Sequence, residues 1–299
     1  MAETESQDVP EFYTGETEII QKKAYPDIKG TIILFFVMMG YMIVTAIPFG
    51  IVMATFKTRL DNSHLLKSLL NLLLYIIALF ITLWYAIRKS KKQEGSFSGI
   101  SLRKIPIWIV PAVLVGTLAL IILLDQTSSW IPKPVSAKKI FEDAFSKDIF
   151  SIISVIVFAP LMEETLCRGI VLKGLLKNYK PGKAIFISAL FFAAIHLNPW
   201  QAIPAFFGGL FLGWVYYKTQ SVLPCIIIHA TINAIATSFL FLPGKSQGFL
   251  SMWGVPGYLA ACLTSIIVFV AVCFIIQKKM QPSAGSGSPL ELKSESAAC

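Results

Sequence analysis

The chain has 299 residues, of which 55% are hydrophobic and 14% are charged. Because soluble domains carry about 25% charged residues, this composition excludes an ordinary soluble protein and predicts a polytopic membrane protein. The formal net charge of +9 could indicate nucleic-acid binding. The basic residues lie in loops between apolar segments, however, where the positive-inside rule accounts for them, and we expect no nucleic-acid partner.

The apolar residues gather in eight segments, most of them near the length that a bilayer requires. We therefore expect an all-α fold, a polytopic membrane helical bundle of about eight transmembrane helices. Eight crossings place both termini on one side, and the excess of Lys and Arg on that side predicts the cytoplasm of a bacterial-type cell. The expected helices cover residues 31–55, 65–87, 105–124, 150–175, 184–197, 202–217, 222–242 and 258–276.

The two ends and the cysteines point to no further module. The N-terminus is acidic and lacks the basic start of a cleavable signal peptide, so we expect the first helix to be retained. The five cysteines are scattered and form no Cys-x-x-Cys pair. We expect neither a disulfide framework nor a zinc knuckle.

Three ionisable residues, Glu163, Glu164 and Arg168, interrupt the fourth apolar segment. Each costs roughly 2.5–3.5 kcal/mol at the centre of a membrane helix, so a simple anchor would not carry them. Glu164 and Arg168 are four residues apart and share a helix face, which predicts a bidentate ion pair. Glu163 points elsewhere and is left as a possible general base.

Two histidines and an asparagine lie in later apolar segments. His196 ends the fifth segment, and His229 and Asn233 share one face of the seventh. Burying these groups is costly unless they satisfy one another or line a wet cavity, so we expect them to converge with the Glu-Glu-Arg helix. A Gly-x-x-x-Gly pair at Gly209 and Gly213 would let the helices approach closely.

The same residues permit two chemistries. A glutamate with a histidine can deprotonate water, while a histidine and an asparagine amide can stabilise the oxyanion that forms when water attacks a carbonyl. Alternatively, Glu163, His196 and His229 could hold a zinc ion with an open fourth position. Because the chain contains no His-x-x-x-His clamp, spacing does not separate these two hypotheses.

The ordered polar motifs resemble those of the CPBP family, the CAAX-protease and bacteriocin-processing membrane peptidases also called Abi proteins. The resemblance covers about residues 150–242. One departure is Gln220, which precedes Ser221 where relatives often have glycine, and which would alter a turn. The three motifs are Glu163-Glu-x-x-x-Arg168, Phe192-x-x-x-His196 and His229-x-x-x-Asn233.

The resemblance implies a membrane endopeptidase. Glu163 would activate water together with His196, supported by the Glu164–Arg168 pair. His229 and Asn233 would stabilise the oxyanion. A metal-free mechanism is favoured, with zinc as the alternative, so no cofactor is expected. The implied partners are the lipid bilayer and a protein or peptide substrate, either prenylated or of the bacteriocin type.

Two functions of other classes remain open. A non-catalytic immunity or scaffolding protein of the same family could keep the fold without turnover. A proton or metal-ion transporter is less favoured, because the sequence shows no duplicated half with matching broken helices.

The motifs also divide the chain. Phe141, Phe145 and Ile149 are spaced four apart and predict a short amphipathic helix in the membrane interface. His64 lies in a charged loop, and we give it no role.

The expected parts are a cytoplasmic tail (1–30), N-terminal transmembrane helices with the interfacial connector (31–148), a catalytic core (149–242), a loop and last helix (243–277) and a flexible tail (278–299).

Overall fold

The structure of the chain is a computed structural model. Helices make up nearly all of the regular secondary structure in its described residues. The structure describes residues 23–58, 63–97, 99–132, 134, 147–242 and 248–280. Most of the expected interfacial helix, including Phe141 and Phe145, lies outside the described residues, as do most of the two predicted tails.

The predicted all-α fold class is confirmed. Each of the eight expected segments coincides with a helical rod in the described part of the chain. Six of these rods are long and apolar enough to cross a membrane. The helices are α1 (Ile28–Thr55), α3 (His64–Glu94), α4 (Ile109–Leu124), α6 (Ile149–Ile153), α7 (Ala159–Leu166), α8 (Lys173–Asn178), α9 (Pro181–Ala194), α10 (Pro199–Thr219), α11 (Leu223–Ser238) and α12 (Phe249–Lys279).

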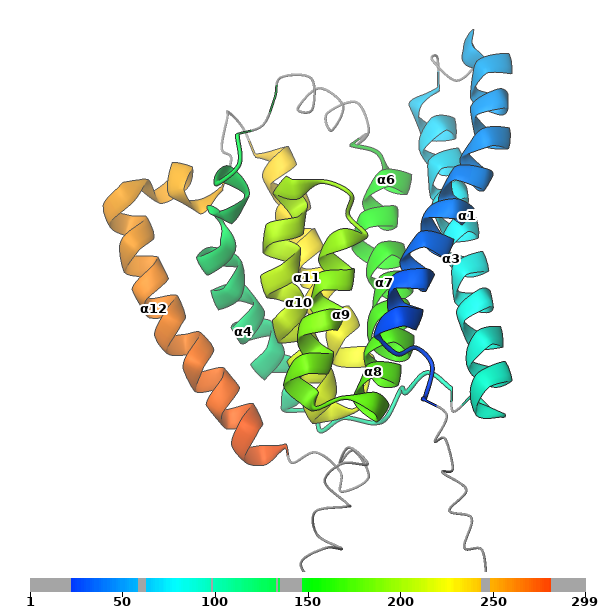
Figure 1. Ribbon diagram of the computed structural model, residues 1–299. Helices are drawn as coiled ribbons and strands as arrows, with labels where there is room; N and C mark the ends of the chain where they lie inside the picture. The colour runs from blue at the N-terminus through cyan, green and yellow to red at the C-terminus, as the bar shows by residue number, and fades with distance from the viewer. Residues whose placement is uncertain are drawn as a thin grey trace, which may run out of the picture.

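The helices form a bundle with two flanking pairs (Figure 1). Helices α1 and α3 pack together on one flank, and α4 and α12 pack together on the other. The α6–α8 rod and helices α9, α10 and α11 lie between them. The first residue of α1 and the last residue of α12 lie at the same end of the bundle, as an even number of crossings requires.

The last helix begins earlier than the sequence predicts, at Phe249 rather than near residue 258. Its first turn precedes a kink at Gly254, where φ is +66°. Because the kink interrupts the helical pattern, the sequence does not predict that this turn belongs to the helix. The turn is capped from α4, because the Asp125 carboxylate accepts hydrogen bonds from the main-chain amides of Phe249 (3.1 Å) and Leu250 (3.3 Å).

Two π-helical turns, Ser154–Phe158 and Cys167–Leu172, join α6, α7 and α8 into one rod. The first has a cause in the sequence. Pro160 has no amide hydrogen, and a proline ring clashes with the carbonyl four residues earlier, which here belongs to Ile156. The wider turn accommodates this proline, and such turns often occur at functional sites. The Glu163–Glu164 pair lies between the two π turns.

The α6–α8 rod is tied to α3 at its start. The Ser68 hydroxyl donates to the Asp148 carboxylate at 2.5 Å, and the same carboxylate caps α6 through the amides of Phe150 and Ser151. Burial alone would raise the pKa of Asp148, but these hydrogen bonds outweigh it and hold the pKa below its usual value. Asp148 is therefore an ionised cap that joins two helices.

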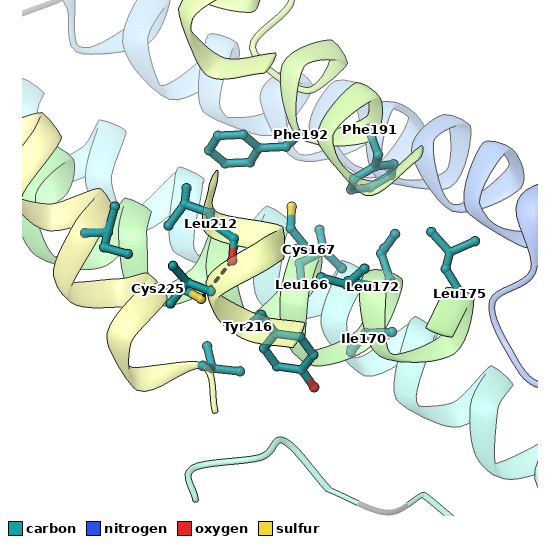
Figure 2. Close-up of a cluster of buried hydrophobic side chains, with 14 of the residues drawn as sticks. Leu166, Cys167, Ile170, Leu172, Leu175, Phe191, Phe192, Leu212, Tyr216 and Cys225 are labelled. Atoms are coloured by element: carbon teal, nitrogen blue, oxygen red, sulfur yellow. Dashed lines mark hydrogen bonds between the residues drawn. The ribbon is translucent and has the colours of Figure 1, made fainter. Parts of the chain in front are cut away.

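Figure 2 shows the centre of the hydrophobic core, where the α6–α8 rod packs against α9, α10 and α11. Leu166, Leu172 and Leu175 are completely buried in this cluster. The Cys225 thiol is buried there too and donates to the Leu212 carbonyl (3.4 Å). The close packing fixes the helices that carry the polar motifs.

The turn between α10 and α11 contains the residue that departs from the family pattern. Gln220 adopts a left-handed conformation, with φ +52° and ψ 32°, and ends α10. Left-handed backbone favours glycine because it lacks a Cβ. The Gln220 side-chain amide donates to the Tyr217 carbonyl (2.9 Å), and this bond offsets part of the strain.

We expect Gln220→Gly to be more stable than Gln220→Ala by about 1 kcal/mol, because both variants lose the amide bond but only glycine relieves the left-handed conformation. Thermal unfolding of the purified protein in detergent measures the difference. Equal unfolding temperatures for the two variants would show that the turn is not strained.

Candidate active site

The centre of the polar cluster is Glu164, whose side chain is completely buried. Its Oε1 accepts hydrogen bonds from Arg168 Nη1 and from His229 Nδ1, both at 2.9 Å. The predicted ion pair is therefore present, but it is not bidentate. Among the described residues, Glu164 Oε2 and Arg168 Nε have no hydrogen-bond partner. His229, expected at the oxyanion, thus also binds the supporting carboxylate.

Arg168 is held by two further groups. Its Nη2 donates to the main-chain carbonyl of Gly209 at 3.1 Å, and its guanidinium carbon lies 4.4 Å from the centre of the Phe192 ring. A buried cation over an aromatic face gains energy from the ring quadrupole. A Cβ on Gly209 would approach Ala189 to 3.2 Å, so the missing side chain permits close packing of α10 on α9.

Phe192 separates the two histidines and contacts both. Its ring meets those of His196 and His229 edge to face, with centroid distances of 5.1 and 5.3 Å. The sequence pattern included Phe192 without a role. In the structure this side chain is 3% exposed and forms the apolar wall against which Arg168 and both imidazoles are positioned.

The histidine hydrogen bonds indicate which ring nitrogens carry protons. His196 Nδ1 lies 2.8 Å from the Phe192 carbonyl, and a carbonyl can only accept, so Nδ1 is the donor. Nε2 of a neutral His196 is then free to accept a proton. His229 Nδ1 likewise donates to the Glu164 carboxylate, which leaves its Nε2 for a substrate.

Glu163 is bound to a residue that the sequence did not single out. Its Oε1 accepts a hydrogen bond from the Tyr75 hydroxyl of α3 at 2.6 Å. Its Oε2 is buried and has no partner among the described residues. Tyr75 is one of several aromatic residues in apolar runs, and no spacing rule links it to a glutamate 88 positions later. Only the packing of α3 on α7 reveals the contact.

The side-chain amide of Asn233 donates one hydrogen bond to the main chain. Its Nδ2 donates to the Val155 carbonyl at 2.8 Å, in the first π-helical turn. An amide nitrogen carries two hydrogens, so one remains for an oxyanion. The bond also joins α11 to the α6–α8 rod.

A cavity of about 560 Å³ lies beside these residues. His196, His229 and Asn233 contribute to its wall, together with Phe192 and apolar residues of α4, α10 and α11. Asp125, Ser128 and Gln201 add polar groups to the lining. The lining does not include Glu163, Glu164 or Arg168. The structure thus brings three predicted residues to one cavity. It also places Glu164 in contact with His229, pairs Arg168 with Glu164, and keeps Glu163 on the side of α3.

A structural or catalytic zinc site requires three or four donor side chains grouped around one point. In the described part of the chain, no three His, Cys, Asp or Glu side chains are grouped to hold a metal ion. Glu163 is engaged by Tyr75 and His229 by Glu164. The candidate ligands Glu163, His196 and His229 therefore do not fit a zinc site in this arrangement.

Comparison with known proteins identifies the segment that carries the site. Residues 145–235 match the model of the Rce1-like family, described as type II CAAX prenyl endopeptidase Rce1-like. This range contains all six predicted site residues. No curated protein and no solved structure matches the chain.

We expect Arg168→Met to lower the free energy of unfolding by about 3–5 kcal/mol, because it leaves the Glu164 carboxylate buried without its cation. Arg168→Lys should recover only part of this loss, since a lysine cannot reproduce the fork that reaches both Glu164 and Gly209. Thermal unfolding in detergent measures both changes.

The matched control is Arg88→Met, which removes an exposed arginine that stacks on Trp84 at 3.8 Å. A surface change of this kind should alter stability by no more than about 0.5 kcal/mol. Similar losses for Arg88→Met and Arg168→Met would contradict a special role for the buried pair.

Proposed function

We propose, on the premise that residues 145–235 belong to the Rce1-like family of peptide hydrolases, that the chain is an intramembrane endopeptidase. It would hydrolyse a peptide bond close to the membrane. The observation that carries this proposal is the buried Glu164–Arg168–His229 cluster next to a cavity lined by His196, His229 and Asn233.

Glu163 is the proposed general base. Its Oε2 has no partner among the described residues and can take a proton from water, with Nε2 of His196 as the second acceptor. Because Glu163 does not line the cavity, it would act on a water between itself and His196 or after rotation of its side chain. The water oxygen attacks the scissile carbonyl, the C–N bond breaks, and the proton passes to the departing amine.

The oxyanion of the tetrahedral intermediate needs hydrogen-bond donors. The second amide hydrogen of Asn233 is a neutral donor. Nε2 of His229 can act as a second donor when both ring nitrogens carry a proton, because Nδ1 already donates to Glu164. Arg168 pairs with the same carboxylate. Glu164 and Arg168 thus hold His229 in place without contacting substrate.

An apolar groove supports a lipid-modified substrate. It has a volume of about 740 Å³ and lies between α4, α10 and α12, with Phe211, Trp214 and Phe269 in its lining. Leu120 and Leu124 line both this groove and the cavity. A hydrocarbon chain in the groove would therefore lie next to a peptide in the cavity. This arrangement supports a CAAX-type substrate with a prenylated cysteine over an unmodified peptide.

The proposed orientation puts the shared end of α1 and α12 in the cytoplasm of a bacterial-type cell. Basic residues collect at this end of the bundle, in the last turns of α3, α8 and α12. Positive charge marks the cytoplasmic side of membrane proteins. The members of this set are Lys91, Lys92, Lys177, Lys278 and Lys279.

One observation favours a second candidate, a non-catalytic immunity or scaffolding protein. Glu163 is engaged by Tyr75 and lies outside the cavity lining, as it could in a protein that keeps the fold without turnover. A protective phenotype that survived simultaneous replacement of Glu163 and His196 would support this function.

We expect Glu163→Gln to lower the cleavage rate by at least about 100-fold, because the amide cannot accept the proton of water. The assay compares peptides that end in the same CAAX sequence with and without a farnesyl group on the cysteine, and only the farnesylated peptide should be cleaved efficiently.

Glu94→Gln is the matched control, since Glu94 is a carboxylate at the end of α3 that binds Tyr25, Ser90 and Lys177 rather than the site. Its activity should stay near that of the unmodified chain. Retained cleavage by a folded Glu163→Gln protein would remove Glu163 from its proposed role.

We expect cleavage to continue after exhaustive chelation, because the described donors are not grouped as a metal site. The measurement is the cleavage rate before and after dialysis against a chelator, with metal content determined in both samples. Loss of activity that zinc restores would contradict the metal-free mechanism.

A further inference from the structure

The N-terminal helix pair contributes directly to the site through one face of α3. Three buried residues, Ser68, Leu72 and Leu79, follow the helical repeat on this face, and the partly buried Tyr75 continues it. This face packs against α6 and α7. Helix α3 lies outside the segment that matches the family, so that match does not describe its contact with Glu163.

The two oxygens of Glu163 have unequal surroundings. Oε1 accepts the Tyr75 hydroxyl at 2.6 Å, whereas Oε2 is buried and without a partner among the described residues. We infer that Tyr75 is a positioning residue for the proposed hydrolysis, because its hydroxyl fixes Oε1 and leaves Oε2 as the oxygen that receives the proton of water. This inference rests on the proposed role of Glu163 as general base.

Among the described residues, no other polar side chain forms a hydrogen bond with Glu163. The polar groups that follow Glu163 on its own rod are Glu164, Cys167 and Arg168, and α11, which packs against α7, carries His229 and Asn233. Three of these groups have other partners: Arg168 and His229 bind Glu164, and Asn233 binds the Val155 carbonyl. Within the described residues, Tyr75 is the hydrogen-bond partner of Glu163, and its loss would leave the carboxyl free to rotate.

The chain provides a matched control on the same helix. Tyr85 lies on α3 and its ring meets Tyr41 of α1 edge to face, with centroids 6.3 Å apart. Tyr85→Phe and Tyr75→Phe remove the same atom from the same residue type in the same helix. Only the second change removes a hydrogen bond to the Glu163 carboxyl.

The first measurement separates binding from turnover. Tyr75→Phe should lower kcat by about 10- to 100-fold, the size of effect expected when a reacting group is misplaced by about 1 Å. KM should change by less than about 2-fold, because the hydroxyl does not bind substrate. Tyr85→Phe should leave both constants unchanged. Tyr75→His keeps an aromatic ring with a donor and should recover part of the turnover.

The second measurement requires no substrate. An infrared difference spectrum of the unmodified protein against Glu163→Gln identifies the carboxyl band of Glu163. Loss of a hydrogen bond alters the stretching frequency of a carboxyl group, so this band should move in Tyr75→Phe and stay in place in Tyr85→Phe. A shift in Tyr75→Phe, at an unfolding temperature close to that of Tyr85→Phe, supports the inference.

The outcomes separate this inference from the function on which it rests. If Glu163→Gln is inactive while Tyr75→Phe keeps its turnover and its band position, the role of Tyr75 is wrong and the proposed function stands. If Glu163→Gln is fully active, the role of Glu163 as general base and the role of Tyr75 are both wrong. Faster turnover in Tyr75→Phe also overturns the inference, because the contact would then restrain Glu163 rather than position it.

Discussion

The constraint on which the rest of the structure depends is the burial of a full ion pair, Glu164 with Arg168, inside an apolar bundle. A buried guanidinium requires acceptors, and its removal from water is costly unless they are in place. The Gly209 carbonyl can reach it because α10 packs closely on α9, and Phe192 covers its face. His229 donates a second hydrogen bond to Oε1 of the carboxylate. The Gly209 carbonyl, Phe192 and His229 are therefore arranged around a buried charge that must be neutralised.

The shape of the central rod distributes the polar groups around that charge. Two π-helical turns enclose α7, and the first presents the Val155 carbonyl to Asn233. Neighbouring carboxylates in a helix point about 100° apart, so Glu164 reaches α11 while Glu163 reaches α3. Two adjacent residues of one motif therefore enter separate hydrogen-bond networks: Glu164 pairs with Arg168 and His229, and Glu163 pairs with Tyr75.

Much of the fold was predictable, because apolar length determines where a chain can cross a bilayer. The convergence of His196, His229 and Asn233 at one cavity was also predicted, from the cost of burying each alone. The bond from His229 to Glu164 was not, since spacing fixes the face of a residue within its helix but not the neighbour across it. The hydrogen bond from Tyr75 to Glu163 was not predicted, for the same reason. The start of α12 was missed because a glycine kink interrupts its pattern.

The ties between α3 and the central rod have a consequence for how the protein can be divided. Ser68 and Tyr75 bind Asp148 and Glu163, and both acceptors lie inside the segment that matches the family, whereas both donors lie outside it. If that segment were expressed alone, the helix-capping carboxylate of Asp148 and the carboxyl group of Glu163 would both lose these hydrogen-bond donors. The boundary drawn by sequence similarity therefore cuts across these hydrogen bonds, and a shortened chain that keeps them must retain α3.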